Sequence, residues 1–483
     1  KSQTRSFLQY KMKGILQSLI NESKGNDTVS SVNSNTSEKK TGGSEVLSTE
    51  LSGDFLLSGC NDWTNSTSKT PGGLDEIHRV ELGSKVKSSF SSSSSMHSFL
   101  LMTDGSIRGM GRNDHGQLAT GDTNTRDLPV TVELPLLSPV VKICTGRSHT
   151  LVLFQNGEVW GCGSNALGQL GLGSGKAITK DIMKFTKITF PSDDSVIRDI
   201  ACGYDFSLVC SNTGKMYSFG HPEYGVLGRG DDGRFIKDGG KGAAVQFSCE
   251  YTPKLIDKFI TKDNHGKVTA TRNYDQIRIR SVAAGKNHAA CVEEWDETTV
   301  FPQYTPANRV YTWGWGGYGR LGHNGPQDEF FPREVTAFSH FIPSPNNPTE
   351  QIICGSSFTL AISATRHLYY WGKMSNAPRG EATVYPQMQQ ELFDYPVRSC
   401  AVGSNLIVVI AGMNNRATGV TDGYTQGPSY AIAWGMPVAG KLGFEGGAKS
   451  STHPKMLSRL SGLDLKQVCC GYGQVSWVVS PET

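Results

Sequence analysis

Short apolar runs of about six residues recur along the chain, and each is bounded by glycine. One kind follows a glycine and a small polar turn, as in GRSHTLVLF from Gly146 and GYDFSLVC from Gly203. A second kind ends in an aromatic or small residue and glycine, as in EVWGCG from Glu158 and KMYSFG from Lys215. Runs of this length between glycines predict β-strands and not helices.

The two kinds of run are joined by dipeptides typical of tight hairpin turns. In three repeats a run of the first kind is separated from the following run of the second kind by such a dipeptide: Asp104-Gly105, Asn156-Gly157 and Thr213-Gly214. A two-residue turn of this kind favours residues that adopt positive φ, and glycine does so without steric cost. Each repeat is therefore predicted to contain an antiparallel hairpin.

Counting the repeats gives the predicted architecture. The second kind of run ends at seven glycines: Gly59, Gly111, Gly163, Gly220, Gly314, Gly372 and Gly435. The first kind follows Gly146, Gly203, Gly285, Gly355, Gly403 and Gly471, with a degenerate copy around Met96. The earliest run, from Phe55, is of the second kind and has no run of the first kind before it. The last run, from Cys469, is of the first kind and has no run of the second kind after it. We therefore expect an all-β, seven-bladed β-propeller closed by pairing of the N- and C-terminal half-repeats.

Composition divides the chain into a tail and a repeat domain. Residues 1–50 are rich in Ser, Thr, Asn and Lys with few aromatic residues, which predicts a low-complexity, disordered N-terminal tail. The propeller is expected over residues 51–480. Its largest interruption is an extended excursion at about 230–276, and smaller insertions occupy 293–308 and 412–430.

Charge and cysteine content limit the kinds of partner and ligand. A net charge of +3 with a pI near 8.2 does not favour direct nucleic-acid binding. The 11 cysteines include no C-x-x-C pair, so neither a zinc site nor a disulfide framework is indicated. Cys202, Cys354 and Cys470 each precede a glycine, which favours a buried apolar role and a reducing intracellular compartment. No apolar run is long enough for a membrane span.

Motifs that suggest catalysis are explained by the repeat. The glycines Gly314, Gly316 and Gly319 match G-x-G-x-x-G, but Gly111 and Gly163 occupy the position of Gly314 in other repeats, so we reject a dinucleotide site. His97, His149 and His288 share one repeat position, which favours hydrogen bonding between blades over a metal or catalytic role. We find no phosphate-binding loop and no nucleophile motif. The sequence predicts a protein that is not an enzyme and needs no cofactor or metal.

Four phrases carry a family resemblance: GRNDHGQL at Gly111, GSNALGQLGLG at Gly163, FGHPEYGVLG at Phe219 and WGWGGYGRLGH at Trp313. They resemble the regulator-of-chromosome-condensation repeat, and the resemblance covers about residues 53–480. The block Asp232–Ile236 is similar to a blade extension of the telophase-disc branch of that family.

The resemblance implies a rigid propeller that engages Ras-superfamily GTPases. The founding member of the family is the guanine nucleotide exchange factor for Ran on chromatin, and the telophase-disc branch is associated with Rac- and Ral-type GTPases. It further implies roles in mitosis, cell division and cytoskeletal organisation, in nucleus and cytoplasm, with the centromere, spindle and midbody as sites of action. Exchange and sequestration of a GTPase remain alternatives. So does a scaffold for centromere, microtubule or chromatin proteins that has no exchange activity.

The resemblance also nominates contact residues. An acidic residue two positions after the first-run glycine contacts the GTPase in the founding member, and Asp205 stands at that position here. Its counterparts in other repeats are polar and neutral: Ser148, Asn287, Ser357 and Asn405. The excursion adds Asp232, Arg234, Phe235 and Ile236 as candidates. The alternative for all of them is a solvent-exposed turn without function.

One repeat departs from the pattern. The serine run Ser91–Ser95 replaces the glycine phrase of the first blade, and Gly109-Met110-Gly111 replaces an aromatic residue and glycine. From these departures we expect a loosely packed first blade.

Overall fold

The computed structural model describes residues 54–60, 73–174, 180–191, 196–237, 244–294, 309–341, 349–374, 382–413, 428–437, 442 and 450–480. The predicted tail at 1–50 and most of the insertions predicted at 293–308 and 412–430 lie outside these residues. The account below concerns the compact unit that begins at Val46.

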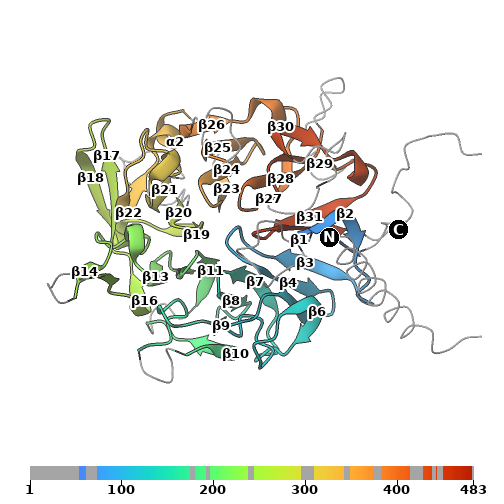
Figure 1. Cartoon of the computed structure of the whole chain (residues 1–483). Coiled ribbons are helices and arrows are strands. Elements are labelled where there is room, and N and C mark those ends of the chain that lie inside the picture. The colour runs from blue at the N-terminus through green and yellow to red at the C-terminus, as the bar shows by residue number, and fades with distance from the viewer. Residues whose placement is uncertain are drawn as a thin grey trace, which may run out of the picture. The chain divides into compact units, whose positions relative to one another are not determined.

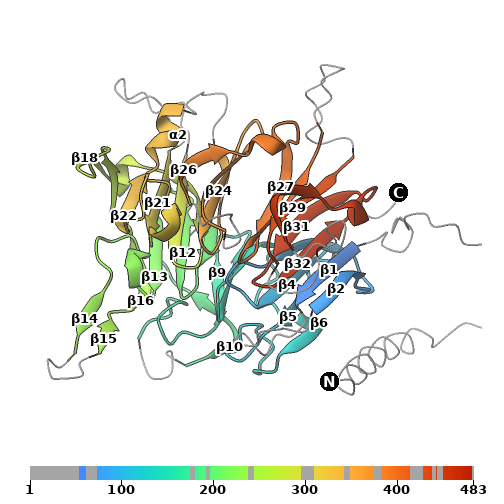
Figure 2. The same cartoon turned by 45° about the horizontal axis from the view of Figure 1, so that its top comes forward.

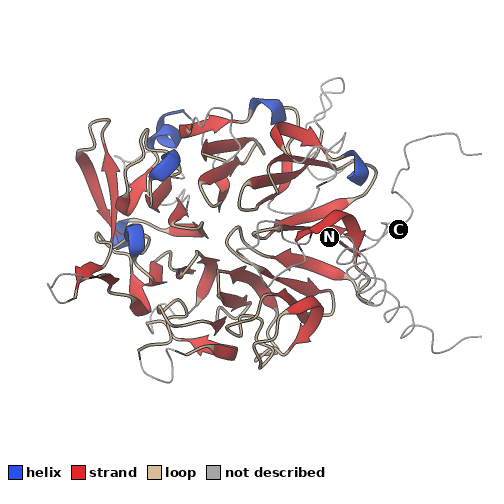
Figure 3. Cartoon of the chain, in the orientation of Figure 1, coloured by secondary structure: helices blue, strands red, loops and turns tan. Residues whose placement is uncertain are grey.

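Seven sheets of at least four strands are arranged around a common centre (Figures 1 and 3), which confirms the predicted seven-bladed propeller. Blade one consists of β3 (Val86–Phe90), β4 (His97–Met102), β5 (Ile107–Gly111) and β6 (Arg126–Val132). Blade two consists of β7 (Val140–Thr145), β8 (His149–Phe154), β9 (Val159–Gly163) and β10 (Ile182–Ile188). Blade three consists of β11 (Ile197–Cys202), β12 (Phe206–Ser211), β13 (Met216–Gly220) and β16 (Glu250–Leu255).

The remaining blades follow the same order from the centre outwards. Blade four consists of β19 (Ile279–Ala284), β20 (His288–Glu293), β21 (Val310–Gly314) and β22 (Glu329–Glu334), and blade five of β23 (Thr349–Cys354), β24 (Phe358–Ser363), β25 (Leu368–Gly372) and β26 (Thr383–Met388). Blade six consists of β27 (Val397–Val402), β28 (Leu406–Ala411), β29 (Tyr430–Gly435) and β30 (Ser451–Met456). Short helical turns lie between strands, at α2 (Thr336–Phe341) and in 3₁₀ form at Glu223–Gly225, Tyr274–Gln276, Gly317–Gly319, Gln390–Leu392 and Ser458–Leu460.

Blade seven is built from both ends of the repeat domain. It consists of β31 (Leu465–Cys470), β32 (Gln474–Val479), β1 (Asp54–Cys60) and β2 (Gly73–Arg79). β1 pairs antiparallel with β32, from Asp54 opposite Val479 to Gly59 opposite Gln474. The predicted closure is therefore confirmed, and this pairing removes the open edge that an incomplete blade would leave.

The seven glycines that end the third strands all have positive φ, between 97° and 113°. A side chain at any of them would be strained, and a Cβ on Gly314 would lie only 2.8 Å from the carbonyl oxygen of Asn287. This close approach lets the next residue, Trp315, donate its backbone N–H to the same carbonyl at 2.8 Å. The repeated glycine thus fixes the turn that follows the innermost strand of its own blade.

The three histidines at one repeat position connect neighbouring blades, as predicted. Nε2 of His97, His149 and His288 lies 2.7, 3.0 and 2.9 Å from a hydroxyl oxygen of the next blade. The hydroxyls belong to Thr150, Ser207 and Thr359, and each donates its own hydrogen to a backbone carbonyl of the histidine's blade at 2.8 Å. Each hydroxyl must therefore accept from the histidine, so Nε2 carries a proton. Burial lowers the pKa of all three histidines, which keeps the rings neutral.

The expectation of a loosely packed first blade is wrong. Ser93, Ser94 and Ser95 are buried, and Met110 is buried in place of the usual aromatic residue. The Ser95 hydroxyl lies 2.9 Å from Nδ1 of His97. The backbone carbonyl of Ser95 accepts the N–H of Tyr472 in blade seven at 2.8 Å. The Ser91 and Ser95 hydroxyls both donate to the carbonyl of His97, and the Ser92 hydroxyl donates to the carbonyl of Thr145, so this turn packs tightly without the glycine phrase.

The excursion predicted at 230–276 contains two separate hairpins with the outer strand of blade three between them. The first is a two-stranded ribbon of β14 (Arg234–Ile236) and β15 (Val245–Phe247), which lies between β13 and β16. The second is formed by β17 (Lys258–Lys262) and β18 (Val268–Asn273) after β16. β17 extends the sheet of blade four through a parallel contact with β22, which gives that sheet six strands. Figure 2 shows the two hairpins apart from one another.

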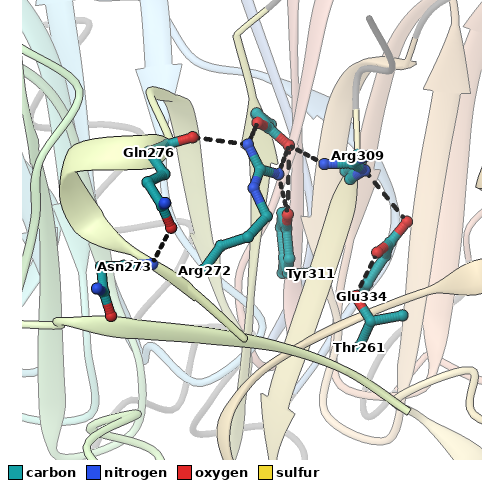
Figure 4. A network of polar contacts seen from close by, with 8 residues as sticks. Thr261, Arg272, Asn273, Gln276, Arg309, Tyr311 and Glu334 are labelled. Carbon is teal, nitrogen blue, oxygen red and sulfur yellow. Dashed lines mark hydrogen bonds and ion pairs between the residues drawn. The ribbon is translucent and has the colours of Figure 1, made fainter. Parts of the chain in front are cut away.

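A network of buried charges attaches the second hairpin to blade four (Figure 4). Arg272 of β18 binds both carboxylate oxygens of Glu293 at 2.6 and 3.0 Å and also donates to the Tyr311 hydroxyl at 3.0 Å. Arg309 lies between Glu293 and Glu334, and Thr261 of β17 donates to Glu334 at 2.7 Å. The hairpin is therefore held by an ion pair and by side-chain hydrogen bonds, and not by strand pairing alone.

Candidate functional site

The turns that join the innermost strand of each blade to the second strand meet on one face around the propeller centre. We call this the inner-turn face and define it by the turns 91–96, 146–148, 203–205, 285–287, 355–357, 403–405 and 471–473. The innermost strands β3, β7, β11, β19, β23, β27 and β31 contact one another in ring order (Figure 1), so their turns lie side by side. All five contact residues predicted from the resemblance therefore share a face.

A cluster of charged and aromatic side chains spans the turns of blades two, three and four. Arg147 binds Asp205 through two contacts, Nη2 to Oδ2 at 2.7 Å and Nε to Oδ1 at 3.0 Å. The Tyr204 ring lies between two cations, with Arg147 Cζ 4.6 Å and Lys286 Nζ 5.0 Å from its centroid. Backbone bonds tie the same turns, since Arg147 donates to the carbonyl of Tyr204 at 3.0 Å and Tyr204 to that of Lys286 at 3.3 Å.

Asp205 is the most strongly engaged of the predicted residues. Its side chain is only 14% exposed, whereas that of Arg147 is 42% exposed. The carboxylate therefore orients a cation at the surface, and it is available to a partner only where Arg147 moves aside. This differs from the free acidic residue that the sequence suggested, because the pairing needs a residue 58 positions earlier in the chain.

The other predicted turn residues contribute mainly through their backbone. Ser148 is 8% exposed, and its carbonyl accepts the N–H of Ser164 at 2.8 Å. The carbonyls of Ser357 and Asn405 accept N–H groups of Lys373 and Met436 at 3.0 and 2.8 Å. The side chains of Asn287, Ser357 and Asn405 are half-buried, so a docked partner can reach them.

The ribbon β14–β15 presents the excursion residues. Ile236 is 65% exposed and lies opposite Val245, which is 52% exposed, so an apolar pair faces solvent. Phe235 is also exposed, and Asp232 pairs with Arg234 at 2.7 Å. A two-stranded ribbon with exposed apolar side chains is a common form of protein-binding element.

The ribbon belongs to the inner-turn face. It connects the end of β13 to the start of β16, and β13 ends beside the turn of Asp205, whose carbonyl accepts the N–H of His221 at 2.9 Å. The His221 ring lies 4.7 Å from that of Phe247 in β15, and burial lowers the pKa of this histidine. The Asp205 turn and the ribbon are thus in contact through one residue.

Sequence reasoning missed the residues directly before the predicted ones. Arg147, Tyr204 and Lys286 stand one position after the first-run glycine, where other repeats have Ser356, Ser404 and Tyr472. A cation, an aromatic ring and a cation in three consecutive repeats was a visible signal.

A second unpredicted cluster lies in the loops of blades three and four. Trp315 stacks on Tyr224 with ring centroids 5.4 Å apart, and the buried Arg320 lies 3.9 Å from the Trp315 centroid. Tyr318, next to them, is 49% exposed. Tyr224 and Tyr318 have φ of 62° and 65°, an uncommon conformation for a tyrosine. Burial lowers the pKa of Arg320 to about 10, which still leaves it charged at neutral pH.

The chemistry of the described residues is that of a binding surface. Among these residues, no group of three or more potential metal ligands is present, and no helix is long and apolar enough to cross a membrane. The inner-turn face instead offers paired charges, a tyrosine ring beside two cations and the adjoining apolar ribbon. These are the features that recognise another protein.

Comparison with known proteins is consistent with this fold. The RCC1-like domain model matches residues 65–478. Among curated proteins, the RCC2 homolog of Danio rerio is 35% identical over 389 residues, which is 80% of this chain and 70% of that protein. Human RCC2 is 34% identical over 392 residues, 81% of this chain and 66% of that protein. The chain thus spans about two thirds of the length of these relatives.

A solved structure shows the same fold at lower identity. The crystal structure of Prp20p from Saccharomyces cerevisiae, described with its binding properties to Gsp1p and histones, has a TM-score of 0.60. The two chains are 19% identical, and the match covers 90% of this chain and 92% of Prp20p. At this identity the likeness concerns the fold.

Proposed function

The chain belongs to the RCC1-like domain family, and on this premise we propose that it regulates a small GTPase of the Ras superfamily through its inner-turn face. The observation that carries the proposal is the cluster of Arg147, Asp205, Tyr204 and Lys286, which joins the turns of three consecutive blades. Clustered aromatic and arginine side chains at the centre of a face are typical of binding hot spots.

Such a regulator needs no chemistry of its own. A protein that binds the nucleotide-free GTPase more tightly than the loaded form lowers the affinity of the GTPase for nucleotide by the same factor. A rigid propeller suits this task, because the turns are fixed before binding and little entropy is lost when a partner docks. Arg147 and Lys286 supply positive charge, and Asp205 supplies negative charge where Arg147 moves aside, for a partner whose nucleotide site contains basic and acidic groups.

The partner we propose is a Rac-, Ral- or Ran-type GTPase, bound either for exchange or for sequestration. The relatives named RCC2 and the binding of Gsp1p by Prp20p support this class of partner. We further propose action in mitosis, at centromere, spindle and midbody, and in cytoskeletal organisation, in nucleus and cytoplasm. The family resemblance supports these settings.

Asp205→Asn is expected to weaken GTPase binding about tenfold, which corresponds to about 1.4 kcal/mol. The substitution keeps the shape of the side chain and removes the charge that orients Arg147. The unfolding free energy should fall by no more than about 1 kcal/mol, because the pair is partly exposed. Biolayer interferometry against immobilised, nucleotide-free Rac-, Ral- and Ran-type GTPases measures the affinity.

The matched control is Lys267→Glu. Lys267 is exposed at the tip of the hairpin β17–β18, which follows the opposite end of β16. This substitution should leave GTPase affinity unchanged, whereas Lys286→Glu on the inner-turn face should reduce it. Equal effects of Asp205→Asn and Lys267→Glu would count against the inner-turn face.

A chromatin-protein scaffold is the second candidate. The description of Prp20p includes histones as well as Gsp1p, which favours this alternative specifically. A scaffold would bind histones or centromere and microtubule proteins without changing the nucleotide state of any GTPase.

A further inference from the structure

Two cysteines face each other across the junction of blades two and three. The Sγ atoms of Cys144 and Cys202 are 2.8 Å apart. Cys144 lies near the end of β7 and Cys202 ends β11, and these innermost strands are in contact. A disulfide has a sulfur–sulfur distance of about 2.05 Å, so the bond requires a movement of only about 0.8 Å.

Two ion pairs between blades two and three lie on either side of the two thiols. Lys142 Nζ binds Asp199 Oδ1 at 2.7 Å on one side of the pair, and Arg147 binds Asp205 at 2.7 Å on the other. Each contact joins the same two blades. The thiols therefore stay opposite one another, which gives them a high effective concentration for bond formation.

This junction is unusual among the repeats. The counterpart positions in the next junctions pair Ala201 with Ala284, Ala283 with Cys354, Ile353 with Val402 and Ala401 with Cys470. Small or apolar residues fill this space in these junctions, and a single cysteine occurs at Cys354, at Cys470 and, in the junction of blades seven and one, at Cys469. Packing alone therefore does not call for the second thiol at this junction.

Access to the two thiols is unequal in a way that suits sequential reaction. Cys144 is half-buried, while Cys202 is 3% exposed. A small reagent therefore reaches Cys144 first, and Cys202 lies directly behind it. This is the arrangement of an attacking and a resolving cysteine.

We propose that Cys144 and Cys202 form a reversible interblade disulfide by exchange with a small disulfide such as oxidised glutathione. Burial and the contact with Cys202 raise the pKa of the Cys144 thiol well above its usual value, so the thiol loses its proton as its sulfur attacks the reagent. The reagent's sulfur–sulfur bond breaks, and one molecule of thiol leaves. The Cys202 thiolate then attacks the Cys144 sulfur and releases the second thiol. The two protons lost by the cysteines pass to the two departing thiolates, so the protein is oxidised by two electrons and the reagent is reduced by two.

The bond would join blades two and three directly beneath the inner turns. It closes a loop between positions 58 residues apart, which restricts the unfolded chain and so stabilises the folded one. The unfolding temperature should therefore rise on oxidation. The proposal concerns the thiols alone and stands independently of any GTPase.

The test is incubation of the reduced full chain with oxidised glutathione, followed by alkylation with N-ethylmaleimide and peptide mapping without reductant. The expected result is one cross-linked peptide pair containing Cys144 and Cys202, lighter by two hydrogens than the separate peptides and cleaved by dithiothreitol. Full alkylation of both cysteines after the incubation would overturn the proposal, and so would glutathione retained on Cys144 of the unsubstituted chain.

Variants separate this site from the other thiols. Cys202→Ala should retain glutathione on Cys144, because the resolving thiol is absent, and Cys144→Ser should show no cross-link. Cys354→Ala removes a buried cysteine at the counterpart position of blade five and should leave the cross-link intact. A cross-link in Cys144→Ser that involves Cys202 and another cysteine would contradict the assignment.

Discussion

Lowering the pH from 6.5 to 5 is expected to reduce the unfolding free energy by about 5 kcal/mol through the three interblade histidines alone. Burial lowers the pKa of His97 to about 3 and that of His149 to about 4, and it lowers the pKa of His288 well below its ordinary value. In the unfolded chain the same side chains titrate near 6.5. Below that pH the unfolded state binds protons that the native state excludes, so stability is lost as the pH falls.

The size of the effect follows from the three neutral rings. Each contributes a slope of about 1.4 kcal/mol per pH unit between its unfolded and folded pKa values, and all three slopes have the same sign. Protonation would place a charge in a fully buried site, and the added proton on Nδ1 of His149 or His288 would have no acceptor among the described residues. Urea denaturation at pH 7.5, 6.5, 5.5 and 5 measures the change.

The propeller provides its own control for this prediction. In the junction of blades three and four, Phe206 stands at the histidine position and Ala289 at the hydroxyl position. The double variant His288→Phe, Thr359→Ala copies that junction and should reduce the pH slope by about one quarter, whatever its stability at pH 7.5, because burial also lowers the pKa of a fourth histidine, His323, well below its ordinary value. A slope unchanged by the double variant, or a stability constant from pH 7.5 to 5, would contradict the neutral histidines.

Glu293→Gln is expected to cost about 3–5 kcal/mol of unfolding free energy. Glu293 is 10% exposed and is the carboxylate partner of both Arg272 and Arg309. Neutralising it leaves two guanidinium groups close together in a largely desolvated site, with Glu334 as the remaining carboxylate partner of Arg309 among the described residues. Thermal and urea denaturation give the global loss.

The adjacent residue supplies a matched control. Glu294 pairs with Arg198 at 3.0 Å at a more exposed position, so Glu294→Gln should cost about 0–1 kcal/mol. Hydrogen exchange localises the effect: amides of β17 and β18 should exchange faster in Glu293→Gln and not in Glu294→Gln. Equal losses in the two variants would show that the network does not hold the hairpin.

Much of the propeller was predictable because its constraints are local and repeated. The seven glycines at the ends of third strands have positive φ, so their spacing marks the blades directly. The histidine bonds also have a sequence signature: His97, His149 and His288 are each matched by Thr or Ser in the next repeat, whereas Phe206 is matched by Ala289. The bounds of the excursion were not predictable from the repeat pattern, because β16, the outer strand of blade three, lies within residues 230–276.

The site was less predictable because its contacts join distant parts of the chain. Asp205 was identified by its position, but its ion pair with Arg147 depends on how two blades pack. The same holds for the Tyr204 ring between Arg147 and Lys286 and for the thiols of Cys144 and Cys202. The repeat position of a residue shows which turn it occupies. Only the packing of neighbouring blades shows which side chains it contacts.

The central claim is that the inner-turn face acts on a GTPase. The most direct measurement is the release of a fluorescent GDP analogue from Rac-, Ral- and Ran-type GTPases, with and without the full chain and its Asp205→Asn variant. We predict a changed release rate for one of them, faster for exchange or slower for sequestration of the loaded form, and a reduced effect of the variant. Unchanged release from all three GTPases would contradict the account and favour the scaffold.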